Sequence, residues 1–293
     1  MKKIIPNLIA LLFICGSCQF NQSVSKDLIT GAYSRADGIG SDDVVMEING
    51  KTETRNEFFY GEKINFVFNN VTGLTTVDGK TYPGLAIYII GNEKDTLFSE
   101  ADVLKNLNDG TELSPLQLHA NFVTALPNKN NEKYKAIVII SDKKGDGKHT
   151  FELPFTIKEN KVLKIKNKDF AYSNIYLWDE TTKQVVIADT ADSSHQLMLI
   201  LEGVEGFKII DGKAFALFSL EITDANGNKI LSSPNMFSNY ETTGMSPEDL
   251  KKQVIARMNF TGGRINNPYK ITSKLKDKNS EKEIEVTTAL YLE

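Results

Sequence analysis

The chain has 293 residues, with 34 Lys or Arg against 38 Asp or Glu and a formal net charge of −4. Its 41% content of hydrophobic residues excludes a collagen-like, low-complexity or wholly disordered chain. The slightly acidic balance gives no electrostatic reason to expect a nucleic-acid partner. A chain of this length suggests two domains, each large enough to bury a core without metals or disulfides.

Residues 1–17 have the order of a secretory signal peptide. Two lysines precede an apolar stretch at 4–14, which is shorter than the ~20 residues of a membrane span, and Cys15-Gly16-Ser17-Cys18 follows. The small residues before Cys18 resemble the lipobox of Gram-negative bacterial lipoproteins, although such motifs usually carry Leu where this chain has Cys15. The resemblance implies cleavage before Cys18 and lipidation of that residue.

A lipid on Cys18 predicts a chain anchored to a membrane of the cell envelope, with the outer membrane expected. Residues 18–30 are polar without a strong period and are expected to form a tether. No acidic run follows Cys18, which favours the periplasmic face over the cell surface. Residues 19–293 contain no cysteine, so the mature chain has no disulfide, thiol catalyst or Cys-based zinc site.

An internal repeat divides the remainder of the chain. Residues 71–82 (VTGLTTVDGKTY) match residues 204–215 (VEGFKIIDGKAF) at a shift of 133 positions, sharing Val, Gly and the Asp-Gly-Lys triplet. Apolar residues before and after this segment continue the match at the same shift. A period this long indicates two similar domains, because solenoid units run to ~20–50 residues. We expect related domains at 31–160 and 161–293.

Each repeat has the pattern of antiparallel strands. Phe151, Leu153, Phe155 and Ile157 alternate with other residues, which buries one face of a sheet and leaves the other wet. Asn-Gly or Asp-Gly pairs, typical of tight hairpin turns, stand at 49–50, 78–79, 146–147, 211–212 and 226–227. The sequence therefore predicts an all-β protein of two tandem, related, immunoglobulin-like antiparallel β-sandwiches.

A short helix is also expected in each repeat. Ser246-Pro247 provides a helix start, and Leu250, Val254, Ile255 and Met258 follow at helical spacing. Ser114-Pro115 stands in the matching place of the first repeat.

No motif for catalysis, metal binding or a cofactor is recognisable. His119, His149 and His195 lack zinc-binding spacing, and we interpret His149, just after the 146–147 turn, as a solvated loop residue. Residues 142–147 superficially resemble a calcium loop but lack its ligand spacing, and a hairpin turn is the better interpretation. We expect no catalytic residue, no metal and no cofactor.

Aromatic residues offer candidate contact sites. Trp178 follows a strand-like run and is interpreted as a core residue between the sheets. Phe58, Phe59 and Tyr60 cannot all face inward on one strand, so they form a candidate contact patch. A bulge or a buried loop is the structural alternative for this triplet.

The sequence favours a non-catalytic binding or interaction module, attached to the membrane through the lipid on Cys18. Its partner is expected to be an envelope protein or a glycan, and a protein is favoured because tryptophan is scarce. Two alternatives stay open: a polymer-degrading hydrolase with an unrecognised carboxylate pair, and a structural spacer in an envelope complex.

Overall fold

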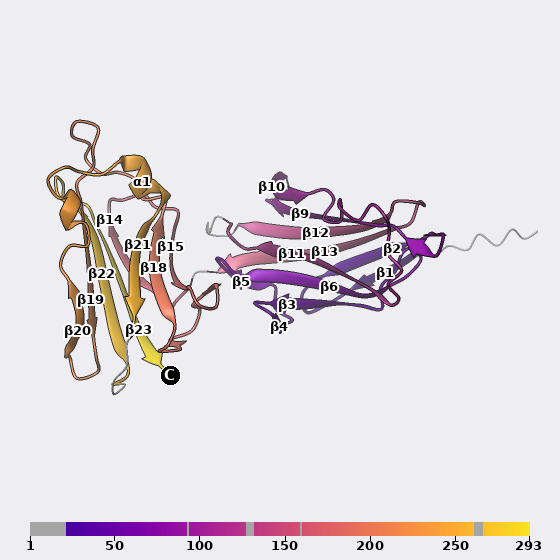
Figure 1. Ribbon diagram of the computed structural model, residues 1–293, viewed down its shortest axis with the longest axis horizontal. Coiled ribbons are helices and arrows are strands. Elements are labelled where there is room, and N and C mark those ends of the chain that lie inside the picture. Colours follow the sequence, from indigo (N-terminus) through magenta and orange to yellow (C-terminus); the bar gives the residue numbers. More distant parts are fainter. Residues whose placement is uncertain (1–21, 93, 127–131, 159, 261–265) are drawn as a thin grey trace, which may run out of the picture.

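The computed structural model describes residues 22–92, 94–126, 132–158, 160–260 and 266–293. In these ranges the chain is built almost entirely of β-strands, arranged as two sandwiches that lie side by side along the long axis of the molecule (Figure 1). The predicted all-β fold with two related antiparallel sandwiches is confirmed. None of the helices in the described ranges is long and apolar enough to cross a membrane.

The first sandwich packs a larger sheet against a smaller one. The larger sheet has the order β1 (Gln22–Lys26), β2 (Tyr33–Asp37), β13 (Lys148–Lys158), β12 (Lys133–Asp142), β9 (Pro83–Gly91) and β10 (Asp95–Glu100), with β5 (Glu57–Phe59) parallel to β13. The smaller sheet has the order β11 (Leu116–Val123), β6 (Lys63–Val71), β3 (Asp43–Ile48) and β4 (Lys51–Thr52). A hairpin of β7 (Thr76–Val77) and β8 (Lys80–Thr81) stands apart from both sheets.

The second sandwich repeats this plan. Its larger sheet has the order β14 (Lys164–Lys168), β23 (Glu283–Leu292), β22 (Tyr269–Asp277), β19 (Ala216–Thr223) and β20 (Lys229–Ser233), with β17 (Thr190–Ala191) parallel to β23. The smaller sheet has the order β21 (Val254–Asn259), β18 (Gln196–Glu202), β15 (Asn174–Asp179) and β16 (Gln184–Val185). Apart from β1, each sheet strand of the first sandwich has a counterpart at the same place in the second.

Strand β1 corrects the expectation that residues 18–30 form a tether. Residues 22–26 pair along their whole length with β2, and the chain turns back through residues 27–32. Asp27 Oδ1 accepts a hydrogen bond from the Ile29 amide at 2.7 Å, which holds this turn. Polar residues on β1, such as Ser23 and Ser25, are typical of a linker, but an edge strand tolerates polar residues on both faces.

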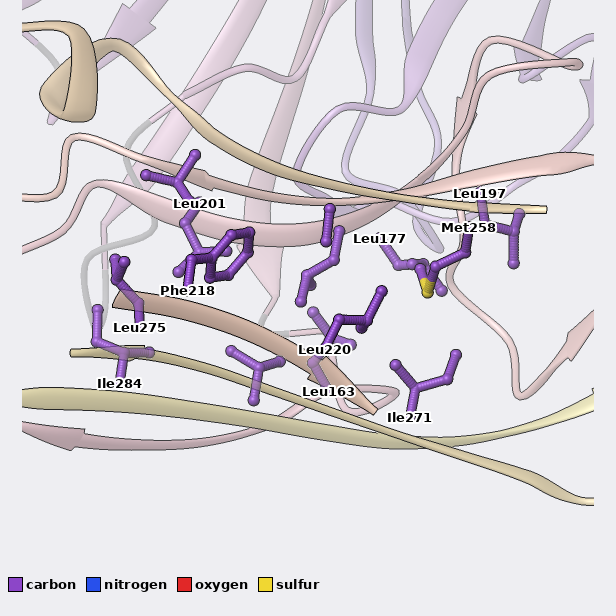
Figure 2. Packing of buried hydrophobic residues seen from close by; sticks show 14 of the residues in the cluster. Leu163, Leu177, Leu197, Leu201, Phe218, Leu220, Met258, Ile271, Leu275 and Ile284 are labelled. Carbon is purple, nitrogen blue, oxygen red and sulfur yellow. The ribbon is translucent and has the colours of Figure 1, made fainter. Parts of the chain in front are cut away.

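Each sandwich has its own hydrophobic core. The first is rich in phenylalanine, and the Phe66 and Phe151 rings from opposite sheets lie 5.1 Å apart. The second is mainly aliphatic (Figure 2), with inward side chains such as Leu177, Leu220 and Ile284 interdigitating between the sheets. The alternation of the strands supplies both cores, because every second residue of β13 and β23 is buried.

The helix predictions need two corrections. Helix α1 (Pro247–Lys252) begins where the Ser246-Pro247 signal predicts, but it ends before Val254, and β21 carries Val254 and Met258 into the core. The β-branched pair Val254-Ile255 fits a strand better than a helix, and pairing with β18 satisfies its backbone. In the described part of the first sandwich there is no helix, and Ser114-Pro115 leads directly into β11. A 3-10 turn, η1 (Ser238–Tyr240), precedes α1.

A buried aspartate ties the loop between the sheets to the larger sheet in each sandwich. In the first, Asp142 Oδ2 accepts a hydrogen bond from the Thr75 amide at 2.7 Å. In the second, Asp277 Oδ2 accepts one from the Lys208 amide at 2.8 Å, and Lys208 is 133 residues after Thr75. Burial alone raises the pKa of Asp142, but hydrogen bonds from Thr75 and Lys144 outweigh it and bring the pKa below its usual value. The carboxylate is therefore ionised at neutral pH.

We expect Asp142→Ala to lower the free energy of unfolding of the first sandwich by about 2–3 kcal/mol, because it leaves the Thr75 and Lys144 amides without their charged acceptor. Asp146→Ala, at an exposed position of the same turn, is the control and should change stability by less than about 0.5 kcal/mol. Chemical denaturation of both variants measures the difference. Equal losses in the two variants would contradict the role given to Asp142.

Candidate functional site

The structure separates the three aromatic residues of the predicted contact patch. Phe58 is fully buried in the first core, where its ring lies 5.2 Å from that of Phe155. Phe59 and Tyr60 are half-buried. Phe58 is therefore unavailable to a partner, and β5 pairing with β13 explains why it faces the core. Cys18, the predicted lipidation site, lies outside the described residues.

The turn that carries Tyr60 is held by a buried carboxylate. Glu62 has no exposed surface, pairs with Arg55 and accepts a hydrogen bond from the Phe59 amide at 2.8 Å. The Arg55 guanidinium also lies over the Phe59 ring at 5.8 Å. These contacts fix the turn and direct Tyr60 away from the first sandwich.

Tyr60 joins the two sandwiches. Its hydroxyl donates to Glu202 Oε2 at 2.9 Å, and the Tyr176 hydroxyl donates to Glu202 Oε1 at 2.8 Å. The rings of the two tyrosines lie 5.2 Å apart. We call Tyr60, Tyr176 and Glu202 the joint. Burial and the Glu202 carboxylate raise the pKa of both phenols, so they remain protonated donors up to at least pH 10, the ordinary pKa of tyrosine.

Close packing accompanies these hydrogen bonds. Gly61 has a positive φ of 83°, and a Cβ atom at this position would come within 2.5 Å of Val185 Cγ2 in the second sandwich. Glycine is needed at this turn both for its backbone conformation and for the approach of β16. The joint is therefore a packed contact rather than a single bridging bond.

Matching edge strands of the two sandwiches expose pairs of large apolar side chains. On β10 these are Leu97 and Phe98, 42% and 43% exposed, and on β20 they are Ile230 and Leu231, 52% and 40% exposed. We call them the edge pairs. The two pairs are separated by the 133-residue shift of the repeat, although no local motif in the sequence indicates them. The signal that could have found the edge pairs is an apolar pair within a polar strand that recurs at this shift.

A β-bulge accounts for the exposure of both neighbours in each pair. In β10 the register with β9 shifts between Thr96 and Phe98, so Leu97 is the extra residue. In β20 the register with β19 skips Ile230 in the same way. A bulge re-aims side chains and twists the free edge of a strand, which disfavours addition of another strand. The edge pairs are therefore suited to contact through their side chains.

A groove opens between the sheets of the first sandwich, at the edge formed by β1 and β2 on one side and by β3 and β4 on the other. Its volume is about 420 Å³, within the range of ligand sites. Val44, Met46, Phe151 and Leu153 give it an apolar floor. The inward positions of β1 and β2 carry only small side chains, which leave the space open: Ser23, Ser25, Ser34 and Ala36. We call this space the edge groove.

His149 lines the edge groove, which corrects its interpretation as a solvated loop residue. It is only 3% exposed, because β13 begins at Lys148 and turns His149 inward. The Ser34 hydroxyl lies 2.5 Å from Nε2, whereas Nδ1 has no hydrogen-bond partner among the described residues. Burial lowers the pKa of His149, so the ring is neutral at pH 7. A catalytic serine–histidine pair needs a third group to orient the ring, and the described residues place none on Nδ1.

The remaining candidate residues lie outside the edge groove. His119 lies exposed on β11, and His195 binds Asp179 Oδ2 through Nδ1 at 2.6 Å, just before β18. Trp178, predicted as a core residue, is instead half-buried on the outer face of β15, and its indole donates to Glu180 at 2.9 Å. Alternation explains this, because Leu177 occupies the inward position. In the described ranges, no group of three or more His, Cys, Asp or Glu side chains could hold a metal ion.

We expect Glu202→Ala to loosen the joint, because the Tyr60 and Tyr176 hydroxyls lose their charged acceptor. The interaction free energy between the two sandwiches should fall by about 2 kcal/mol. Spin labels at Lys51→Cys and Asn226→Cys report the distance distribution between the sandwiches by electron paramagnetic resonance. Glu205→Ala is the matched control, since among the described residues the Glu205 side chain forms only an exposed ion pair, with Lys251. The distribution should be at least twofold broader in the Glu202 variant; equal widths in both variants would refute the joint.

Comparison with known proteins gives no family assignment: no family model and no curated protein matches the chain. Among solved structures, the chain is similar to pT26-6p, with 9% identity and a TM-score of 0.26, covering 89% of this chain and 63% of that chain, less than two thirds of its length. It is also similar to the Streptococcus agalactiae AgI/II polypeptide BspA C-terminal domain, with 11% identity and a TM-score of 0.23, covering 85% of this chain and all of that one. The sandwich topology itself is read from the strand pairing of this chain.

Proposed function

We propose that this protein is a lipid-anchored, non-catalytic binding module of the bacterial cell envelope, and that its partner is another envelope protein. The observation that carries the proposal is the presence of an edge pair at the same position of both sandwiches. Exposed leucine, isoleucine and phenylalanine on a strand edge lose contact with water when a partner covers them, which favours association.

Duplication strengthens such a contact without new chemistry. If both edge pairs bind the same partner or two copies of it, the second contact forms at a high effective concentration. The joint supports this arrangement, because Tyr60 and Glu202 limit the motion of one sandwich against the other. Two edge pairs held in a defined relation present a divalent surface.

A protein partner agrees better with the edge pairs than a glycan does. Sugar-binding sites commonly use exposed aromatic faces, whereas the edge pairs contain one aromatic ring, that of Phe98, among three aliphatic side chains. The edge pairs are mainly aliphatic and offer few hydrogen-bonding groups for hydroxyls. Their chemistry suits an apolar protein surface.

The anchoring part of the proposal rests on the lipobox-like residues before Cys18. Strand β1 begins at Gln22, four residues after Cys18, so a lipid there holds the first strand within about 14 Å of the membrane surface. The first sandwich then lies directly against the headgroups, on the periplasmic side of the outer membrane. The second sandwich extends the binding surface away from the anchor.

For the anchor, we expect Cys18→Ala to move the protein from the membrane fraction to the soluble fraction, because the acyl chains are the only strong membrane attachment proposed. Fractionation of cells expressing each form, followed by immunoblotting, measures this shift. Asn21→Ala, which leaves Cys18 and the residues before it in place, serves as the control. A Cys18→Ala protein that stays fully with the membrane would show that the lipid is not the anchor.

For the partner, we expect a photo-crosslinking amino acid at Leu97 or Ile230 to give the same discrete product in cells. The same group at Tyr291, which is 46% exposed on the central strand β23 of the second sandwich, is the control and should give none. A Leu97→Asp, Phe98→Asp change should lower the yield at Ile230 at least tenfold, because divalent binding is lost. Equal products at Tyr291, or none at either edge pair, would count against the proposed function.

A further inference from the structure

The edge groove is specific to the first sandwich. Register with the larger sheet places Ser34 opposite Phe151 in the first sandwich and Ile165 opposite Val286 in the second. The same comparison places Ile284, fully buried, at the position of His149. The second sandwich thus has two isoleucines where the first has a hydrogen-bonded Ser–His pair. The repeat shows that this edge can be packed with aliphatic side chains, whereas the first sandwich keeps it open and polar.

One polar atom of the groove lacks a partner. Only 3% of the His149 surface is exposed. Its Nε2 contacts Ser34, whereas its Nδ1 forms no hydrogen bond among the described residues. Leaving a buried polar atom unpaired costs about 1–3 kcal/mol. Nδ1 itself has almost no accessible surface, so the Ser34–His149 pair forms a polar part of the groove wall that the second sandwich lacks.

The rim of the groove carries one sign of charge. Its four titratable carboxylates form no ion pair within the described ranges, and none of the described lining residues is Lys or Arg: Asp27, Asp42, Asp43 and Glu53. Asp42 accepts a hydrogen bond from Asn70, and Asp27 from its own turn, whereas Asp43 and Glu53 are exposed. Carboxylates around an apolar floor attract a cation that has an apolar body.

The groove is also elongated. Its lining runs from Ala36 along β2 to Ala32, the residue before that strand, a length of about 13 Å at about 3.3 Å per residue. An extended peptide of four or five residues fills such a length, with its alternate side chains directed to the floor and to the rim. A compact ligand would leave much of the apolar floor in contact with water.

We infer that the edge groove binds an extended peptide segment of a partner protein in which basic residues alternate with apolar ones. The apolar side chains cover Val44, Met46 and Phe151, and the basic side chains reach Asp43 and Glu53 on the rim. This site is distinct from the edge pairs, which lie on strands β10 and β20, so either assignment can fail without the other.

The inference is tested by titrating the full chain, in detergent micelles, with two peptides. The basic peptide is Ac-Leu-Lys-Val-Lys-Leu-NH2, and the acidic one is Ac-Leu-Glu-Val-Glu-Leu-NH2. We expect the basic peptide to bind and to shift the NMR signals of the His149 ring, and the acidic peptide to bind at least tenfold more weakly. The Ser34→Ile, His149→Ile variant takes its residues from the second sandwich, and should lose at least tenfold in affinity for the basic peptide.

The exposed rim gives a second variant that leaves the core intact. Asp43→Asn, Glu53→Gln should weaken the basic peptide about tenfold and reduce the salt dependence of its binding. Lys51→Gln, on the neighbouring strand β4, is the control and should bind at least as tightly as the wild type. Failure of the basic peptide to bind, equal affinity for the acidic peptide, or unchanged affinity in the rim variant would overturn the inference.

Discussion

The two sandwiches depend on one constraint: the chain must cross from the smaller sheet to the larger one without leaving backbone amides of the crossing loop unpaired. The crossings follow β6 and β18. In each, an amide of the crossing loop donates to a carboxylate at the end of a central strand: Thr75 to Asp142, and Lys208 to Asp277. Gly73, just before Thr75, is required because a Cβ there would come within 1.9 Å of the Gly38 carbonyl oxygen. With the crossing fixed, β6 and β9 enter opposite sheets, and one core forms between them.

Around this shared frame the two repeats differ where their edges meet solvent. The second sandwich packs isoleucine at positions 165 and 284, whereas the first places serine and histidine at the matching sites and adds β1 beside them. Small inward residues on an added edge strand cannot fill the space between two sheets, and a groove results. The first sandwich therefore gives up some packing at one edge, and it is at such a place that a ligand can supply the missing contacts.

Much of the fold could be predicted from the sequence, because alternation at period two and Asn-Gly or Asp-Gly turns are local signals. Asn49, Asp78 and Asp211 do adopt positive φ before their glycines. Three predictions were wrong where tertiary pairing overrode local pattern. Residues 254–258 joined β18 as a strand despite their helical spacing, Trp178 lay on the outer face because Leu177 took the inward one, and the polar residues 22–26 became an edge strand. Each depended on which neighbouring strand was present, and spacing along the chain does not contain that information.

The candidate sites were less accessible to sequence reasoning, for a related reason. His149 looked solvated because it follows a hairpin turn, yet the register of β12 with β13 continues to it and carries its ring inward. The edge pairs are hidden because a bulge, and not a composition bias, exposes both neighbours. Comparison of the two repeats helps in both cases. It distinguishes a feature present in both copies at the shift of 133, such as Leu97 and Ile230, from a feature present in one copy, such as His149. In the edge pairs the shared feature is a bulge at the same position of both sandwiches, whereas the Ser34–His149 pair has no counterpart in the second sandwich.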